Sequence, residues 1–160
     1  MEARLIALKL FLDELNLDCD ISTVQDRKRF QKAVFLGQMA GAEMGYRYGW
    51  YLMGPYSPAL TRDYYELSEA LSVDDEDVEK YSLNSSVKSL LERIKPLFSV
   101  PPSVNLAVED WLELLSSILY LEKVSELDDD TMREKIKTEK PALVDHIEKG
   151  SETLESLNLL

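Results

Sequence analysis

The sequence of 160 residues has little of the chemistry that most catalytic and metal sites need. It contains one cysteine, Cys19, and one histidine, His146. A single cysteine excludes an internal disulfide and a zinc site built from several thiolates. A single histidine has no second imidazole or thiol to complete a metal site or a nucleophile–base pair, so we expect His146 on a helix surface. The sequence therefore predicts no catalytic residues, no metal and no cofactor.

Long uncharged apolar runs are also missing. Residues 1–15 carry charges through their apolar run, where a secretory signal would have none. No apolar run reaches the length that a bilayer requires. Together with the lone cysteine, these features predict a cytoplasmic protein without membrane contact.

Basic residues are outnumbered, and the excess of acid is uneven along the chain. The net charge is −12, and residues 57–160 hold 23 acidic and 11 basic side chains. Such a surface repels nucleic acid and anionic membranes, which argues against general nucleic-acid binding. The acidic second half favours a basic protein partner.

The one dense basic cluster lies where a helix is expected to begin. Its members are Arg27, Lys28, Arg29 and Lys32. Arg47, further along the chain, is a separate cation that we consider with them. Cations in the first turn of a helix oppose its dipole by roughly 0.3–1 kcal/mol each, so helix stability does not explain them. They are either a solvated face paired with the acidic second half or a contact for phosphates or an acidic partner.

Apolar spacing predicts a chain that is mainly α with a small β-sheet, an α+β fold. Helices are expected over residues 2–15, from Thr23 or Asp26 to about 40, and over 58–71, 84–97, 104–124, 131–138 and 142–157, the last with a weak point at Gly150. A strand is expected over 46–51, and residues 72–83 fit a short hairpin or an exposed loop. That hairpin would make the amino-terminal half winged-helix-like, followed by a helical carboxyl-terminal half. We expect a single domain, 1–160, whose proline-containing segment 99–103 is the one candidate for an internal boundary.

The segment 46–71, YRYGWYLMGPYSPALTRDYYELSEAL, joins an aromatic strand to a Gly-Pro corner and a helix opened by Ser57 and Pro58. Most of its rings suit a core. The polar side chains are harder to bury without partners, so they and the neighbouring rings are candidates for a partner-binding surface. These candidates are Tyr46, Tyr48, Trp50, Tyr51, Tyr56, Ser57, Arg62 and Asp63.

Four stretches carry a family resemblance: DRKRFQKAVFL, GWYLMGPYSPALTRDYYEL, WLELLSSILYLEKV and IKTEKPALVDHIEKG. Their order resembles that of the bacterial YwgA-like proteins of the Panacea (SocA-like) antitoxin superfamily, over roughly residues 24–158. The resemblance implies a mostly helical, protein-binding domain, because Panacea domains are antitoxins that neutralise toxins by direct contact and occur in phages and defence neighbourhoods. The positions that match the shared motif are Gln31, Lys32, Tyr48, Tyr51, Gly54, Pro55, Tyr56, Ser57 and Leu60.

Three functions follow from these observations. The first is a non-enzymatic, antitoxin-like protein-binding module that restrains or recruits a toxin, nuclease or other defence component. The second is a winged-helix-like regulator associated with nucleic acid through the basic cluster. The third is an acidic mimic of nucleic acid that inhibits a basic enzyme. The sequence leaves the oligomeric state open, a homo-oligomer included.

Overall fold

A computed structural model describes residues 1–74 and 76–160. Helices dominate, and the one sheet among the described residues is a two-stranded hairpin. This confirms the prediction of a mainly α fold with a small β-sheet. No helix in the described ranges combines the length and apolarity that a membrane span requires.

Two helices form the centre of the molecule. Helix α2 (Val24–Met39) packs against α6 (Val108–Leu119), and both are buried over most of their circumference. Helix α2 begins with a capping box in which Thr23 and Asp26 exchange hydrogen bonds, as their spacing predicts. Gly37 of α2 admits the ring of Phe11, because a Cβ there would lie 2.1 Å from Phe11 Cζ.

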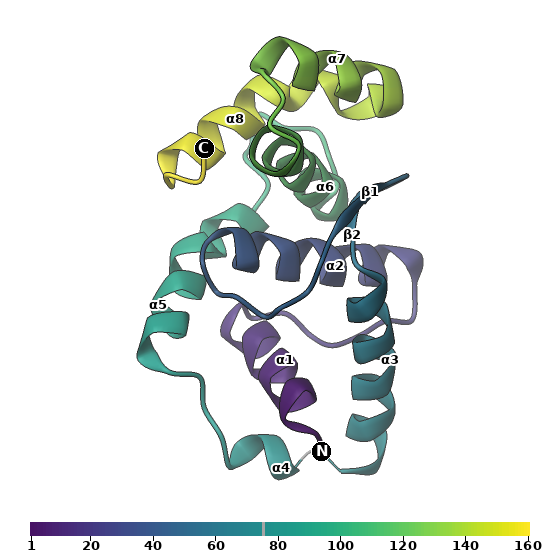
Figure 1. Cartoon of the computed structure of the whole chain (residues 1–160), viewed down its shortest axis with the longest axis vertical. Helices are drawn as coiled ribbons and strands as arrows, with labels where there is room; N and C mark the ends of the chain where they lie inside the picture. The colour runs from purple at the N-terminus through teal and green to yellow at the C-terminus, as the bar shows by residue number, and fades with distance from the viewer. Residues whose placement is uncertain (75) are drawn as a thin grey trace.

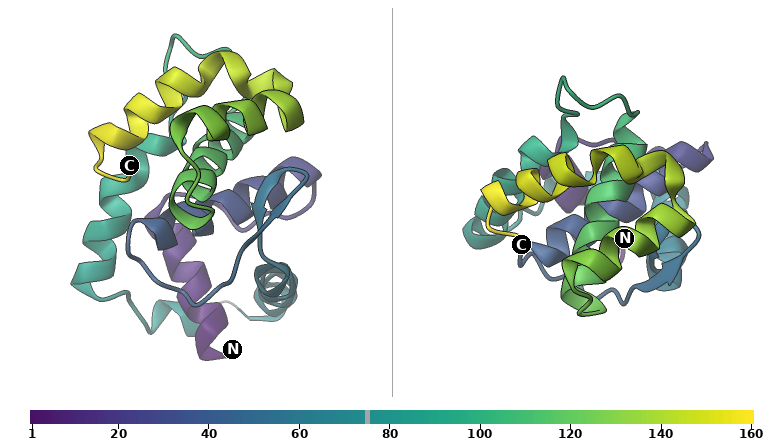
Figure 2. Two further views of the ribbon diagram at one scale, coloured as in Figure 1. Left: turned by 45° about the horizontal axis from the view of Figure 1, so that its top comes forward. Right: turned by 90° about the horizontal axis from the view of Figure 1, so that it is seen from above.

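The other amino-terminal helices pack around α1 (Ala3–Glu14). They are α3 (Pro58–Val73), α4 (Glu76–Glu79) and α5 (Ser85–Ile94), the last continued by the 3₁₀ turn η1 (Lys95–Phe98). Asn84 caps α5, which begins within one residue of the expected start at 84. Figures 1 and 2 show this group at the amino-terminal end of the molecule.

The carboxyl-terminal elements lie on the other side of α6. They are the π turn η2 (Tyr120–Val124), α7 (Asp129–Glu139), the 3₁₀ turn η3 (Pro141–His146) and α8 (Ile147–Ser156). The last helix is divided at His146 rather than at the expected Gly150, which α8 runs through. Buried residues on both sides of segment 99–103 form one apolar cluster.

The hairpin is shorter and earlier in the chain than expected. Strand β1 (Gly49–Tyr51) pairs antiparallel with β2 (Gly54–Tyr56), and Leu52 and Met53 form the turn. The sequence indicated a corner at Gly54 and Pro55, but both are strand residues, each buried. The strand expected over 46–51 is therefore limited to its last three residues.

Of the two alternatives for residues 72–83, a short hairpin or an exposed loop, the hairpin is wrong. Residues 76–79 form α4, and Asp75 lies outside the described residues. The acidic run there favours a helical turn because its carboxylates lie at the helix amino terminus. The observed hairpin lies between α2 and α3, so a wing following the third helix is absent from the described part of the chain.

Candidate functional site

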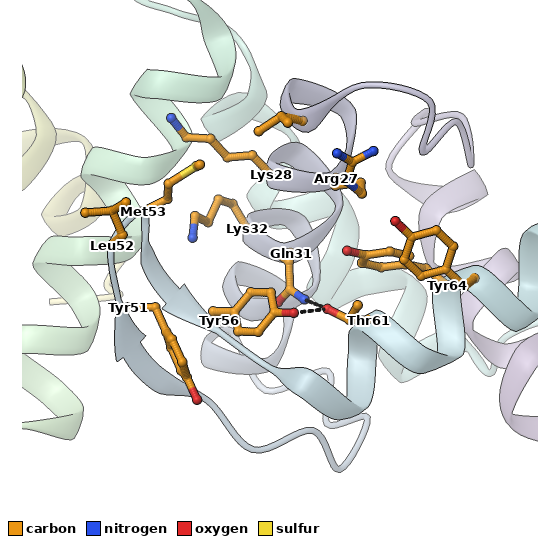
Figure 3. A pocket seen from close by; sticks show the side chains of 12 residues that line it. Arg27, Lys28, Gln31, Lys32, Tyr51, Leu52, Met53, Tyr56, Thr61 and Tyr64 are labelled. Atoms are coloured by element: carbon orange, nitrogen blue, oxygen red, sulfur yellow. Dashed lines mark hydrogen bonds between the residues drawn. The ribbon is translucent and has the colours of Figure 1, made fainter.

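An open pocket lies between the hairpin, the first half of α2 and the start of α3 (Figure 3). Its volume is about 410 Å³, within the range typical of sites that bind side chains or small molecules. The lining comprises Val24, Arg27, Lys28, Gln31, Lys32, Tyr51, Leu52, Met53, Tyr56, Thr61, Tyr64 and Tyr65. We call this cavity the hairpin pocket.

Exposed apolar side chains form the rim of the hairpin pocket. Leu52, at the turn, is 87% exposed, and Tyr51 is 49% exposed. Val24, Met53 and Tyr65 complete the rim and are also exposed. Of the eight large apolar side chains exposed in the described structure, these five surround one cavity. Such a concentration marks an interaction surface, whereas single exposed apolar residues carry no such meaning.

A paired hydrogen bond holds the base of the hairpin to α2. The side-chain amide of Gln31 donates to Ser57 O and accepts from Ser57 N, both at 2.9 Å. Gln31 also donates to Thr61 Oγ1 at 3.0 Å, and the Thr61 and Tyr56 hydroxyl oxygens are 2.6 Å apart. These bonds fix the Tyr56 ring in the pocket wall.

Buried lysines hold the upper part of the hairpin. Lys32 Nζ donates to Pro55 O at 2.7 Å, and Lys140 Nζ donates to Leu52 O at 2.6 Å. Lys140 and Lys28 also pair with the two carboxylate oxygens of Glu113, at 2.9 and 2.6 Å. One buried glutamate on α6 thus pairs with two buried lysines. We call Lys28, Lys32 and Lys140 the lysine cluster.

The electrostatics of the lysine cluster differ between its members. Burial lowers the pKa of Lys32 to about 7, and the nearby ammonium groups of Lys140 and Lys28 add to this, while Glu113 opposes it. Burial also disfavours the charged form of Lys28, but hydrogen bonds to Asp110 and Glu113 outweigh it and raise the pKa of Lys28. Lys32 is therefore the member whose charge is least supported by carboxylates.

Gly54 brings the hairpin onto α6. Its φ is +89°, which favours glycine. A Cβ at this position would lie 2.9 Å from Ser117 Oγ and 3.6 Å from Lys32 Nζ. Only glycine lets the hairpin backbone lie this close to α6, so packing explains the glycine at position 54.

The aromatic candidates separate into core, bridging and open positions. Tyr48 packs on Phe35, and its hydroxyl is buried, so burial raises the pKa of Tyr48 well above the usual value. Trp50 stacks on Tyr120 with ring centroids 5.7 Å apart and donates to Glu139 at 3.2 Å. Only Tyr51 and Tyr56 of the eight partner-binding candidates line the hairpin pocket.

The polar candidates mostly have structural partners. Tyr46 donates its hydroxyl proton to Asp63 at 2.7 Å, and Asp63 also pairs with Arg4 at 3.3 Å. Ser57 is fully buried and caps α3 by accepting from Leu60 N, so its expected place on an open surface is corrected. Arg62 is exposed and does not line the hairpin pocket. The motif residues Gly54, Pro55 and Leu60 are buried.

The basic cluster is not a continuous solvated face. Lys28 and Lys32 are buried, and Lys28 and Arg29 pair with the second half of the chain through Asp110, Glu113 and Glu109. These ion pairs agree with the expected pairing between the basic cluster and the acidic second half. The burial of Lys28 and Lys32 does not agree with the expected solvated face. Arg47 is exposed, far along the chain from the others. For contact with a nucleic acid, the expected set offers few outward-facing cations.

Several residues that line the hairpin pocket or hold the hairpin in place were not predicted from the sequence. Leu52 and Met53 lie between the expected strand, which ends at residue 51, and the Gly-Pro corner, and neither was among the predicted binding residues. Glu113 has a clearer signal, because it is the one charge inside WLELLSSIL and must face a cation if that helix is buried. Lys140, directly before Pro141, has no comparable signal.

Comparisons with protein-family models, with curated proteins and with solved structures found no match. Within the described residues, no group of three or more His, Cys, Asp or Glu side chains is placed to hold a metal ion.

Proposed function

We propose that the chain is a non-enzymatic protein-binding module and that the hairpin pocket is its contact surface. The observation that carries this proposal is the exposed apolar rim around an open cavity, formed by Tyr51, Leu52 and Met53 with Val24 and Tyr65. Desolvated apolar anchors in a pocket supply much of the energy of protein–protein binding. The anchored hairpin presents this rim without requiring a large rearrangement.

The class of partner that we propose follows from the family resemblance. A YwgA-like member of the Panacea superfamily would act as an antitoxin-like or accessory protein that restrains or recruits a toxin, nuclease or other defence component in the cytoplasm. The pocket supports such a role because exposed apolar side chains surround an open cavity.

The experiment compares two matched variants of the full chain. Leu52→Asp places a charge on the pocket rim, and Val73→Asp places the same charge at an equally exposed apolar site, since Val73 is 85% exposed and does not line the pocket. Each tagged protein is used to capture partners from a lysate of the source cell, with bound proteins identified by mass spectrometry. We expect a partner retained by the wild type and Val73→Asp and lost with Leu52→Asp.

The captured protein is then purified and its affinity measured by calorimetry. Loss of a buried interface anchor costs about 2 kcal/mol or more, which is roughly 30-fold in Kd. Equal retention by Leu52→Asp and Val73→Asp would contradict the pocket as contact surface. A chain that captures nothing specific, while both variants remain folded, would contradict the protein-binding function itself.

A further inference from the structure

The charges that line the hairpin pocket are opposite to those of the whole chain. The chain has 30 acidic and 18 basic residues. The pocket lining has three basic side chains, Arg27, Lys28 and Lys32, and no aspartate or glutamate. Because of this reversal, a partner segment that enters the pocket meets positive charge, although a partner approaching elsewhere meets negative charge.

Carboxylates of the protein only partly neutralise the lysine cluster. Lys28 pairs with Asp110 at 2.7 Å and with Glu113 at 2.6 Å. Glu113 is shared with Lys140, and Lys32 has a backbone carbonyl as its hydrogen-bond acceptor. Two carboxylates therefore serve three lysines, and Lys32, whose pKa burial lowers to about 7, has no carboxylate as its hydrogen-bond acceptor.

Arg27 places a positive charge at the pocket edge (Figure 3). Its Nη1 donates to Ile21 O at 2.9 Å and to Ser22 O at 3.4 Å, and these are its hydrogen bonds within the described ranges. None of the ion pairs among the described residues includes Arg27. A guanidinium has five N–H donors, so Arg27 keeps donors for a ligand carboxylate.

These observations define the chemistry of the occupant. We propose that the hairpin pocket binds an acidic segment of the partner protein, in which a large apolar side chain enters the cavity and a neighbouring carboxylate pairs with Arg27. This inference rests on the proposed function, because it specifies what the protein-binding surface recognises. The apolar side chain enters beside the rim formed by Leu52 and Met53, and the carboxylate pairs with Arg27, whose hydrogen bonds within the described ranges go to backbone carbonyls.

A polypeptide fits these features better than a nucleic acid. Sequence-independent binding of nucleic acid requires many cations along a phosphate backbone, whereas the pocket offers one half-exposed guanidinium in front of buried ammonium groups. The rim at Leu52 also extends outward from the cavity, and an extended segment covers it more fully than a small molecule does.

The test starts from a random dodecapeptide library displayed on phage and selected against the immobilised full chain. We expect selected peptides to carry aspartate and glutamate beside Leu, Phe or Trp, with acidic residues enriched about twofold over the unselected library. The same selection uses Arg27→Glu and, as a charge-matched control, Arg47→Glu, whose arginine is exposed and outside the pocket. Acid enrichment should disappear with Arg27→Glu and persist with Arg47→Glu.

A selected peptide labelled with fluorescein then gives affinities by anisotropy. Arg27→Gln should weaken binding about tenfold, as expected for the loss of a charge-assisted hydrogen bond. Replacing the peptide's acidic residues by their amides should have the same effect, and doing both should add little. Circular dichroism melts verify that each variant is folded.

Four outcomes would overturn the inference. If selected peptides lose binding to Leu52→Asp but show no acid enrichment, the partner segment is not acidic, and the proposed function remains intact. Absence of any peptide that depends on Leu52 would count against both. Displacement of the acidic peptide by single-stranded or duplex DNA at lower concentration than by unlabelled peptide would favour nucleic acid, and Leu52-dependent self-association in sedimentation would make a second copy the occupant.

Discussion

The two sides of the hairpin differ in how their atoms are used. On the inner side, the carbonyl oxygens of Leu52 and Pro55 accept from buried ammonium groups, and both backbone polar groups of Ser57 pair with one glutamine side chain. On the outer side, the side chains of Tyr51 and Leu52 have extensive exposed apolar surface. Substitutions on the inner side should lower the free energy of unfolding, because they leave buried polar groups without partners. Substitutions on the outer side should change it little.

The sharpest way to break the inner side is to remove its shared carboxylate. Glu113→Gln keeps the shape but leaves Lys28 and Lys140 without their common partner, and an uncompensated buried charge costs about 3–5 kcal/mol. Urea denaturation should show this loss in the free energy of unfolding. Glu134→Gln, at an exposed position outside the ion pairs found in the described structure, should change it by less than about 0.5 kcal/mol. Similar free energies of unfolding for the two variants would contradict the pairing of Glu113 with Lys28 and Lys140.

The next effect concerns the contact between the hairpin and α6. Gly54→Ala adds a Cβ at 2.9 Å from Ser117 Oγ and imposes positive φ on alanine, and we expect a loss of about 2 kcal/mol. Gly45→Ala is the control, because Gly45 has a similar φ of +82° and no atom within 4 Å of the added carbon. The difference between the two variants measures the contact, and adding Ser117→Ala to Gly54→Ala should recover part of it.

Lys32 predicts a dependence of stability on pH. Its pKa is about 7 in the folded chain and near 10.5 when unfolded, so between these values the unfolded state binds more protons and stability rises with pH. From pH 7 to 8.5 the gain is on the order of 1–2 kcal/mol. Lys32→Met should abolish this difference in urea denaturation.

The titratable groups facing Lys32 are Lys28, Glu113 and Lys140, so each measurement is made against the matched variant in the same buffers. The window ends at pH 8.5 because burial raises the pKa of Cys19 to about 11, and this thiol lowers stability at higher pH. Wild type and Lys32→Met with parallel pH profiles would contradict the lowered pKa of Lys32 in the folded chain.

The smallest effect on folding is expected on the outer side. Leu52→Asp should change the free energy of unfolding by less than about 0.5 kcal/mol, because its side chain is 87% exposed and its structural contribution is a backbone carbonyl. Differential scanning calorimetry compares it with Val73→Asp. A large loss with Leu52→Asp alone would show that the rim is structural, and the comparison between the two sides would no longer hold.

The helices could be predicted because their signals are local. Thr23, Asn84 and Asp128 cap α2, α5 and α7, whose first residues lie within two positions of the expected helix starts. The hairpin was misplaced because Gly54-Pro55 is a turn signal in isolation, and tertiary contact with α6 makes it a strand. Local propensity does not include such a contact.

The site was harder to predict, since its polar residues are assigned by pairs distant in sequence. The basic cluster was expected in solvent, yet Lys28 is buried because Glu113, 85 residues later, approaches it. Tyr51 and Tyr56 were included among the candidates, but the same pattern included Tyr48, whose ring packs against the core. Strand alternation does not distinguish these cases when the strand is three residues long.

The position of Lys140 limits how the protein can be divided. Every residue that lines the hairpin pocket lies between Val24 and Tyr65, so a fragment ending near residue 100 would contain the complete lining. It would nevertheless lack Lys140 and Glu113, which hold the turn and the buried ammonium groups from the other end of the chain. Transplanting the pocket into another scaffold therefore requires these two distant residues as well as residues 24–65.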